Sequence, residues 1–145
     1  MATTLFDLSG KVAIVSGAAQ GMGRAIALAL AEAGADLLLV DRNEPGVQRT
    51  AEEVRQLGRR ALPDSTDVSV PAQVIALFQR LDGEFGRIDF LANVAGESIM
   101  ARPEDISLED VEQVWRNLVL GRFCACQEAG RRMLKAGGGS ILNIG

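Results

Sequence analysis

Short apolar runs of strand length alternate along the chain with longer segments whose apolar residues recur every three or four positions. The short runs predict strands at residues 11–16, 36–40, 60–65, 88–92 and 140–144. The longer segments predict helices at about 22–33, 44–57, 71–85 and 108–136. Because strands that alternate with helices form βαβ units, the predicted fold class is α/β, a doubly wound parallel sheet in a single domain, 1–145.

Each predicted helix carries an apolar stripe that is expected to face the sheet. In the first helix the stripe is Met22, Ala25, Ile26, Ala29, Leu30 and Ala33, and Gly34 ends the helix. In the second it is Val47, Ala51, Val54 and Leu57, and in the third Val74, Leu77, Phe78, Leu81 and Phe85. The long helix is different, because its apolar residues spread over more than one stripe: Val111, Val114, Trp115, Leu118, Phe123, Cys126 and Met133.

Composition removes several classes of function. The net charge is −4 and the basic residues are scattered, so neither a nucleic acid nor an anionic membrane is an expected partner. No run of about 18 apolar residues is present, and the first seven residues lack the features of a signal peptide. Cys124 and Cys126 are the only cysteines and are expected to be reduced packing residues in a cytoplasmic protein. The sequence has no His, and no metal site is expected.

The first predicted strand runs directly into a glycine-rich loop and then into a helix. Glycine allows a tight turn and a close approach of the backbone, and a helix N-terminus offers free N–H groups to an anion. This is the arrangement that binds a pyrophosphate in Rossmann-type folds, whereas the alternative is a βα turn that is merely rich in glycine. The residues predicted to bind a dinucleotide here are Ser16, Gly17, Gln20, Gly21, Met22 and Gly23.

The glycine spacing, Gly-x-x-x-Gly-x-Gly, resembles the loop of the short-chain dehydrogenase/reductase family, with Ser16 in place of Thr. Asp67-Val68, the run Asn93-Val94-Ala95-Gly96 and the segment 139–144 resemble further motifs of that family in the same order. The resemblance covers about residues 5–145 and implies a strand order of 3-2-1-4-5, cut after the fifth strand. It also implies that Asp67 and Val68 contact adenine, and that Asn93, Ala95 and Gly96 belong to the cofactor site.

The choice between NAD and NADP depends on the end of the second strand. Asp41 lies eighteen residues beyond Gly23, where a carboxylate can accept hydrogen bonds from the adenosine ribose and repel a 2′-phosphate. Gln20 is neutral where NADP-preferring relatives often carry a base. Arg42, by contrast, favours NADP, since a base at this place can hold a 2′-phosphate. Because Asp41 is closer to the ribose, NAD is the predicted cofactor.

The residues that perform proton transfer in the family are missing. The resemblance implies a Tyr-x-x-x-Lys pair and a Ser, but the sequence contains no Tyr, and the expected Ser would follow residue 145. A fourth family residue is an Asn in the long helix. An ungapped alignment puts Leu118 at that position, and Asn117, the catalytic candidate, lies one residue early. Asn117 could serve only if the helix held a bulge or shift; an exposed polar residue is the favoured alternative.

Two hypotheses follow. In the first, the chain is the N-terminal part of an NAD-dependent dehydrogenase that acts on a small alcohol or ketone and forms a homo-oligomer through the long helix, as the resemblance implies. In the second, it is a non-catalytic nucleotide-binding or interaction module. In either case the 145 residues alone are expected to be inactive. They are also expected to aggregate through the apolar edge formed by Ile141, Leu142 and Ile144.

Overall fold

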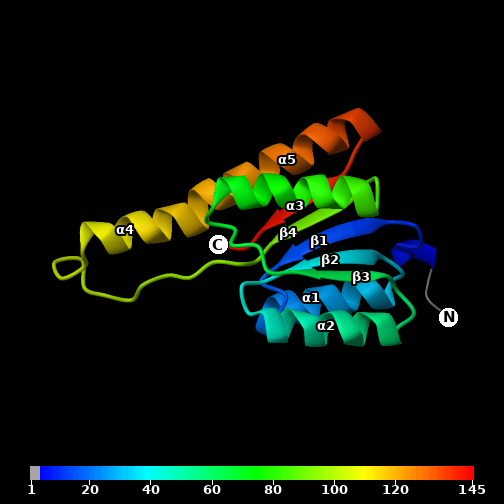
Figure 1. Cartoon of the computed structure of the whole chain (residues 1–145), viewed down its shortest axis with the longest axis horizontal. Helices are drawn as coiled ribbons and strands as arrows, with labels where there is room; N and C mark the ends of the chain where they lie inside the picture. Colours follow the sequence, from blue (N-terminus) through cyan, green and yellow to red (C-terminus); the bar gives the residue numbers. More distant parts are fainter. Residues whose placement is uncertain (1–3) are drawn as a thin grey trace.

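The computed structural model describes residues 4–145 and shows five parallel strands in the order β3-β2-β1-β4-β5 (Figure 1). Met1–Thr3, the start of the stretch that lacks signal-peptide features, lies outside the described residues. The strands are β1 (Val12–Ser16), β2 (Asp36–Val40), β3 (Ala61–Asp64), β4 (Phe90–Asn93) and β5 (Ser140–Asn143). Each predicted strand is present, shifted by two residues at most at either end, and the predicted fold class and strand order are confirmed.

Helices cover both faces of the sheet (Figure 1). One face carries α1 (Gly21–Glu32) and α2 (Glu44–Gln56), and the other carries α3 (Pro71–Glu84) and α5 (Gly121–Ala136). The smaller elements are the 3₁₀ turn η1 (Thr4–Phe6) and the helix α4 (Leu108–Trp115), which precedes α5. Within residues 4–145 no helix has the length and the apolar character needed to cross a membrane.

The central strands are buried because both of their faces meet helices. Ile14 of β1 pairs with Leu38 and Leu91 on the neighbouring strands, and all three side chains join the core under α3 and α5. The next residues along these strands point to the opposite face and join the core over α1 and α2. This explains why β1 and β2 are apolar without alternation, as expected for parallel strands inside a two-sided core.

Two of the predicted helix stripes are wrong in detail. The buried residues of α1 are Gly23, Ala27 and Ala31, whereas Met22, in the predicted stripe, is 56% exposed. Small residues face the sheet because they let the helix approach it closely, and larger side chains such as Ile26 pack along the sides. Leu57 is 45% exposed because α2 ends one residue earlier and Leu57 turns away from the core.

The predicted long helix is not a uniform α-helix. Between α4 and α5 lies η2 (Arg116–Leu120), a π-helical turn in which the backbone hydrogen bonds span one more residue than in an α-helix. The helical run continues through this turn, so its limits agree with the prediction. However, the extra residue changes the directions in which the side chains on either side of it point.

Candidate nucleotide-binding site

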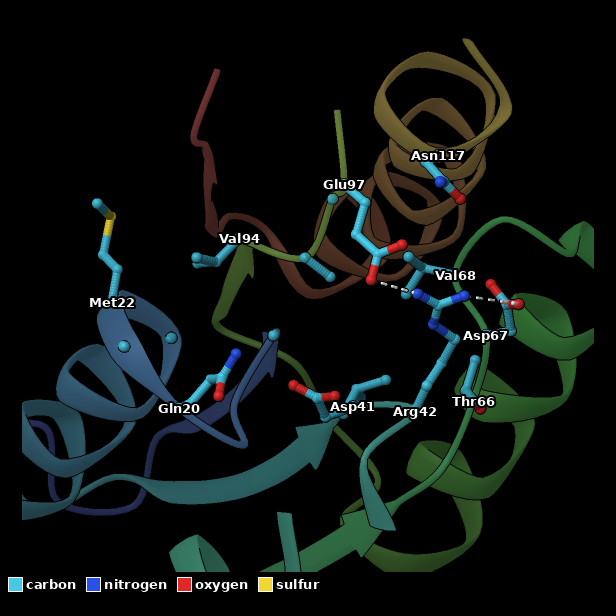
Figure 2. A pocket seen from close by; sticks show the side chains of 16 residues that line it. Gln20, Met22, Asp41, Arg42, Thr66, Asp67, Val68, Val94, Glu97 and Asn117 are labelled. Carbon is cyan, nitrogen blue, oxygen red and sulfur yellow. Dashed lines mark ion pairs between the residues drawn. The ribbon is translucent and has the colours of Figure 1, made fainter. Parts of the chain in front are cut away.

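The loops that follow β1, β2, β3 and β4 meet at the carboxyl edge of the sheet and enclose a pocket of about 320 Å³ (Figure 2). A pocket at this edge, where the strand order reverses between β1 and β4, is the usual ligand site of an open α/β sheet. It is lined by Gly17, Gln20, Gly21, Met22, Gly23, Val40, Asp41, Arg42, Thr66, Asp67, Val68, Val94, Ala95, Gly96, Glu97 and Asn117. The structure thus brings the glycine loop and Val94–Gly96 into one crevice, as predicted, whereas Asn93 of the predicted segment does not line it.

The glycine loop adopts a geometry that side chains would prevent. Gly17 and Gly21 have φ angles of 71° and 54°, in the left-handed region that favours glycine. A Cβ atom on Gly23 would lie 2.1 Å from the carbonyl oxygen of Gly17, so α1 packs directly on the loop. Gln20 is the N-cap of α1 and makes no side-chain capping bond, which leaves the first N–H groups of the helix facing the pocket. Free N–H groups at the start of a helix can bind an anion.

Ser16 and Asn93 were expected at the cofactor, but both are buried and neither lines the pocket. The Ser16 hydroxyl donates to the carbonyl of Ala92 (3.3 Å) and accepts hydrogen bonds from the backbone N–H groups of Val94 and Ala95 (3.1 Å each). It therefore holds the loop after β4 against the end of β1.

The Asn93 amide also makes its hydrogen bonds inside the protein, toward β5 and α5 on the other side of β4. It donates to the Asn143 side chain (2.9 Å) and to the Cys126 sulfur (3.5 Å), which joins β4 to β5 and α5. Ser16 and Asn93 thus shape the pocket from behind its surface.

Asp41 lies at the end of β2 and faces the pocket. Its carboxylate accepts hydrogen bonds from the backbone N–H groups of Ala19 (3.0 Å) and Asn43 (2.9 Å). The first bond ties it to the glycine loop, and the second begins the turn into α2. Asp41 is thereby held beside the glycine loop at the start of α1.

Arg42 crosses the mouth of the pocket (Figure 2). Its guanidinium lies 2.7 Å from a carboxylate oxygen of Glu97, after β4, and 3.9 Å from one of Asp67, after β3. The hydrogen bond and charge of Glu97 raise the pKa of Arg42. Burial raises the pKa of Asp67, but hydrogen bonds from Ser69 and the charge of Arg42 outweigh it and leave that pKa below its ordinary value. The ion pairs join three loops that are far apart in the sequence.

Asn117 lies in the π-helical turn and is 7% exposed. The favoured alternative, in which Asn117 is an exposed polar residue on a regular helix, is therefore wrong. The helix contains the bulge that the prediction named as the condition for Asn117 to face the site. Leu118 takes a different direction: a Cβ atom on Gly96 would lie 2.2 Å from its Cδ2, so Leu118 covers the loop after β4. Of these two neighbouring residues, only Asn117 lines the pocket, whereas Leu118 packs on the loop after β4.

Several pocket residues were not predicted, among them Val40, Thr66 and Glu97. Glu97 directly follows the Asn93–Gly96 motif, so its proximity to the site could have been noticed. Its pairing with Arg42 could not, since 55 residues separate the two and only the packing of their loops brings them together.

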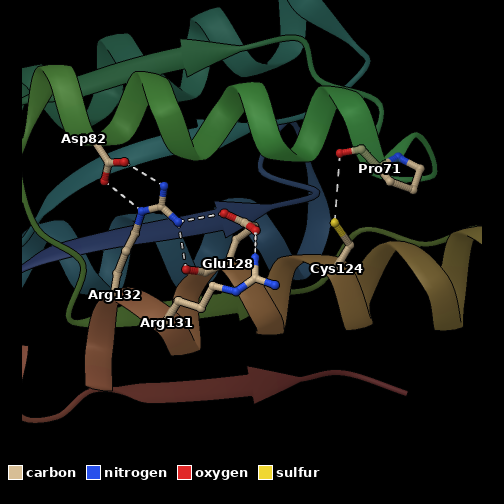
Figure 3. Close-up of polar contacts among 6 residues, drawn as sticks. All are labelled: Pro71, Asp82, Cys124, Glu128, Arg131 and Arg132. Carbon is tan, nitrogen blue, oxygen red and sulfur yellow. Dashed lines mark hydrogen bonds and ion pairs between the residues drawn. The ribbon is translucent and has the colours of Figure 1, made fainter. Parts of the chain in front are cut away.

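A second polar cluster lies outside the pocket and fastens α5 to α3 (Figure 3). The Arg132 guanidinium donates to both carboxylate oxygens of Asp82 (2.7 and 2.6 Å) and to Glu128 (2.8 Å). It also lies 5.1 Å from the ring centre of Phe78. The hydrogen bond from Arg132 lowers the pKa of Asp82. This cluster holds in place the helix that begins beside the pocket.

The sequence profile of the family described as short chain dehydrogenase matches residues 11–145. The chain belongs to the short-chain dehydrogenase family. This family consists of oxidoreductases, and the order of motifs along the present chain is the one expected from the resemblance.

Individual relatives agree. The chain is 42% identical over 139 residues to a D-threitol dehydrogenase of Mycolicibacterium smegmatis, covering 96% of this chain and 54% of the relative. It is 38% identical over 149 residues to a 2-dehydro-3-deoxy-D-gluconate 5-dehydrogenase of Escherichia coli, covering 99% and 56%. The chain thus spans about half the length of the curated relatives it matches.

Solved structures share the fold. A xylitol dehydrogenase with bound NAD⁺ superimposes with a TM-score of 0.90 at 34% identity, over 94% of this chain and 53% of the other. A 7α-hydroxysteroid dehydrogenase complexed with NADH and 7-oxo glycochenodeoxycholic acid gives a TM-score of 0.91 at 32% identity, over 96% of this chain and 54% of the other.

Proposed function

We propose that this chain forms the dinucleotide-binding half of an NAD-dependent dehydrogenase, which transfers hydride between the nicotinamide ring and an alcohol or ketone carbon. The observation that carries the proposal is the pairing of two features in one pocket. The free N–H groups at the start of α1 suit a pyrophosphate, and the Asp41 carboxylate beside them suits the hydroxyls of the attached ribose. The close packing of Gly23 on Gly17 supports the fit, because side chains there would fill the phosphate cradle.

The preference for NAD over NADP rests on Asp41 and Arg42. A 2′-phosphate on the ribose would lie next to the Asp41 carboxylate, which repels it. Arg42, the base that could attract it, is already paired with Glu97 and Asp67. Both features disfavour the extra phosphate by electrostatics alone.

The chemistry of the whole enzyme depends on more than these 145 residues. Bound NAD would supply the ring that accepts or donates hydride. The residues of this chain would hold the adenosine and pyrophosphate, but the chain contains no Tyr to transfer the alcohol proton. Two relatives have names that refer to the polyols threitol and xylitol, which supports a small alcohol as the substrate. The two free cysteines fit a cytoplasmic location.

Titration of the purified chain with NADH and NADPH, followed by nicotinamide fluorescence, tests the proposal. We expect NADH to bind at least about tenfold more tightly than NADPH, since close charges in a surface pocket interact by roughly 1–4 kcal/mol. Asp41→Ala should remove this preference, whereas Asp105→Ala, an Asp-to-Ala change outside the pocket, should keep it. If neither nucleotide binds, a non-catalytic interaction module is favoured, and an unchanged preference in Asp41→Ala would refute the ribose role.

An activity assay that follows NADH absorbance with a panel of ketones and alcohols tests whether the chain alone is catalytic. The chain alone should show no turnover, because removal of a general acid–base typically costs a factor of about 10²–10⁴. Turnover above background would point to a proton donor other than Tyr.

We also propose that the protein forms a homo-oligomer through α4 and α5. Val111, Trp115 and Phe123 are 43%, 57% and 62% exposed, while Met133, at the other end of α5, faces the core. Exposed apolar side chains on one helical run are typical of a protein–protein interface. Light scattering at micromolar concentration should show an oligomer that Phe123→Glu dissociates. A monomeric wild-type protein of full length would refute this.

A further inference from the structure

Arg122 lies near the start of α5, and its side chain is directed toward the loop after β4. The residue is partly buried. Its Nη2 atom donates a long hydrogen bond to the carbonyl oxygen of Ala95 (3.4 Å). The same atom would lie 3.1 Å from a Cβ atom on Gly96, so the glycine leaves room for the guanidinium. Because Ala95 and Gly96 line the nucleotide pocket and Arg122 does not, the guanidinium lies directly behind the pocket wall.

The charge of Arg122 is not neutralised by a neighbouring carboxylate. Its Nε atom is buried and has no hydrogen-bond partner, and no ion pair within residues 4–145 includes it. Arg132, further along the same helix, is by contrast paired with Glu128 and Asp82. A charge that is partly removed from water and has no counter-ion acts over a longer distance than a paired surface charge, because less solvent screens it.

The other charged groups of the pocket do not cancel this charge. The Glu97 carboxylate, after β4, is already paired with Arg42, which also lies near Asp67. The Asp41 carboxylate is held by backbone N–H groups at the end of β2, on the opposite side of the glycine loop from the loop after β4. Arg122 therefore makes the β4 side of the pocket positive, and Asp41 makes the β2 side negative.

The two halves of a dinucleotide would meet these two sides separately. With the adenosine ribose beside Asp41 and the pyrophosphate at the start of α1, the rest of the molecule continues toward the loop after β4, since a dinucleotide lies across the crevice of such a sheet. That half carries the nicotinamide ring, which is cationic in NAD⁺ and neutral in NADH. A fixed positive charge behind the loop therefore disfavours the oxidised form alone.

We infer that Arg122 determines a preference of the site for the reduced cofactor, because its guanidinium repels the cationic ring of NAD⁺ and leaves NADH unaffected. The inference rests on the proposed function. It adds a residue that acts through its charge from behind the pocket wall, without contact with the nicotinamide ring. Protein charges near a cofactor ring are a general means of favouring one of its redox states.

Isothermal titration calorimetry of the purified chain with NADH and with NAD⁺ tests this inference. The wild-type chain should bind NADH about tenfold more tightly than NAD⁺, the approximate effect of two unit charges about 10 Å apart at an effective dielectric constant of about 20. Arg122→Gln and Arg122→Met remove the charge, and each should lower the ratio of the NAD⁺ and NADH dissociation constants by about tenfold. Arg122→Lys keeps the charge and should keep this ratio within about threefold of wild type.

Arg116→Gln is the matched control, because Arg116 is exposed on the same helical run, pairs with Glu112 and lies outside the pocket. It should leave the ratio unchanged. A purely structural role of Arg122 would weaken the binding of both nucleotides by the same factor. An unchanged ratio in the two charge-free variants, or equal affinities of the wild-type chain for NADH and NAD⁺, would overturn the inference while the proposed function stands. If the wild-type chain binds neither nucleotide, the proposed function is wrong as well.

Discussion

Replacing Gly23 by Ala tests whether the glycine loop is a cradle built by close backbone contact. The new Cβ atom would lie 2.1 Å from the carbonyl oxygen of Gly17 and 2.5 Å from its carbonyl carbon, whereas ordinary contacts begin near 3.4 Å. The neighbours are backbone atoms, so no side chain can rotate away. The loop and the start of α1 must separate by about 1.3 Å.

A displacement of this size would break hydrogen bonds from the start of α1 to a bound pyrophosphate, because N···O distances in hydrogen bonds vary only between about 2.7 and 3.2 Å. Hydrogen bonds to a charged group contribute about 1.5–3 kcal/mol each. Loss of two such bonds to the pyrophosphate would cost at least about 3 kcal/mol, which weakens NADH binding by a factor of about 150 or more. Overpacking should also lower the free energy of unfolding by about 1–3 kcal/mol.

NADH fluorescence titration measures the binding, and urea denaturation followed by circular dichroism measures the stability. Gly83→Ala is the matched control, because Gly83 lies exposed within α3 and a Cβ atom there has no atom within 4 Å. This control should raise the free energy of unfolding by about 0.5–1 kcal/mol and leave NADH binding unchanged. A folded Gly23→Ala protein that bound NADH within about threefold of wild type would show that α1 does not supply the phosphate contacts.

Three further perturbations have definite expected outcomes. Glu97→Gln releases Arg42 from its ion pair, so NADPH affinity should rise by about tenfold in calorimetry while NADH affinity stays within about twofold; no gain for NADPH would refute the pairing argument. Ser16→Ala leaves two backbone N–H groups without their partner and should lower the free energy of unfolding in urea by about 2 kcal/mol, whereas Ser16→Thr should keep most of it; equal stability of all three proteins would contradict this. Arg132→Lys cannot pair with both oxygens of Asp82 and should cost about 1 kcal/mol at pH 7. Because the pKa of Asp82 is lowered in the folded protein, this difference should persist above pH 3.8 and shrink as the carboxyl protonates below it; a difference independent of pH would exclude the ion pair as its cause.

The sequence alone was sufficient to predict the elements, their order and the position of the glycine-rich loop, because these depend on local properties. The period of apolar residues distinguishes strand from helix, and parallel strands buried on both faces are apolar without alternation. The glycines are required by the backbone itself, since Gly17 and Gly21 adopt conformations that other residues avoid. The place of Asp41 was predictable for a related reason, since the residue directly after a parallel strand lies at the carboxyl edge of the sheet.

The tertiary structure alone decided how these pieces meet. Periodicity marked an apolar stripe on α1, but contact with the sheet selected Gly23, Ala27 and Ala31, since small side chains allow the closest approach. Ser16 and Asn93 carry the family motifs, yet the packing of neighbouring loops takes up their hydrogen bonds inside the protein.

Residues around the pocket also depend on contacts between segments that are distant in the sequence. Arg42 and Glu97 lie on two loops that are far apart in the sequence, and no local pattern predicts that they form an ion pair. Asn117 looks like an exposed helix residue in any uniform 3.6-residue repeat. Its burial depends on one extra residue in a π-helical turn and on the contact between Gly121 and Val68, which forms only when the helix packs against the loop after β3. Local periodicity therefore determined the elements, and long-range contact determined which side chains line the pocket.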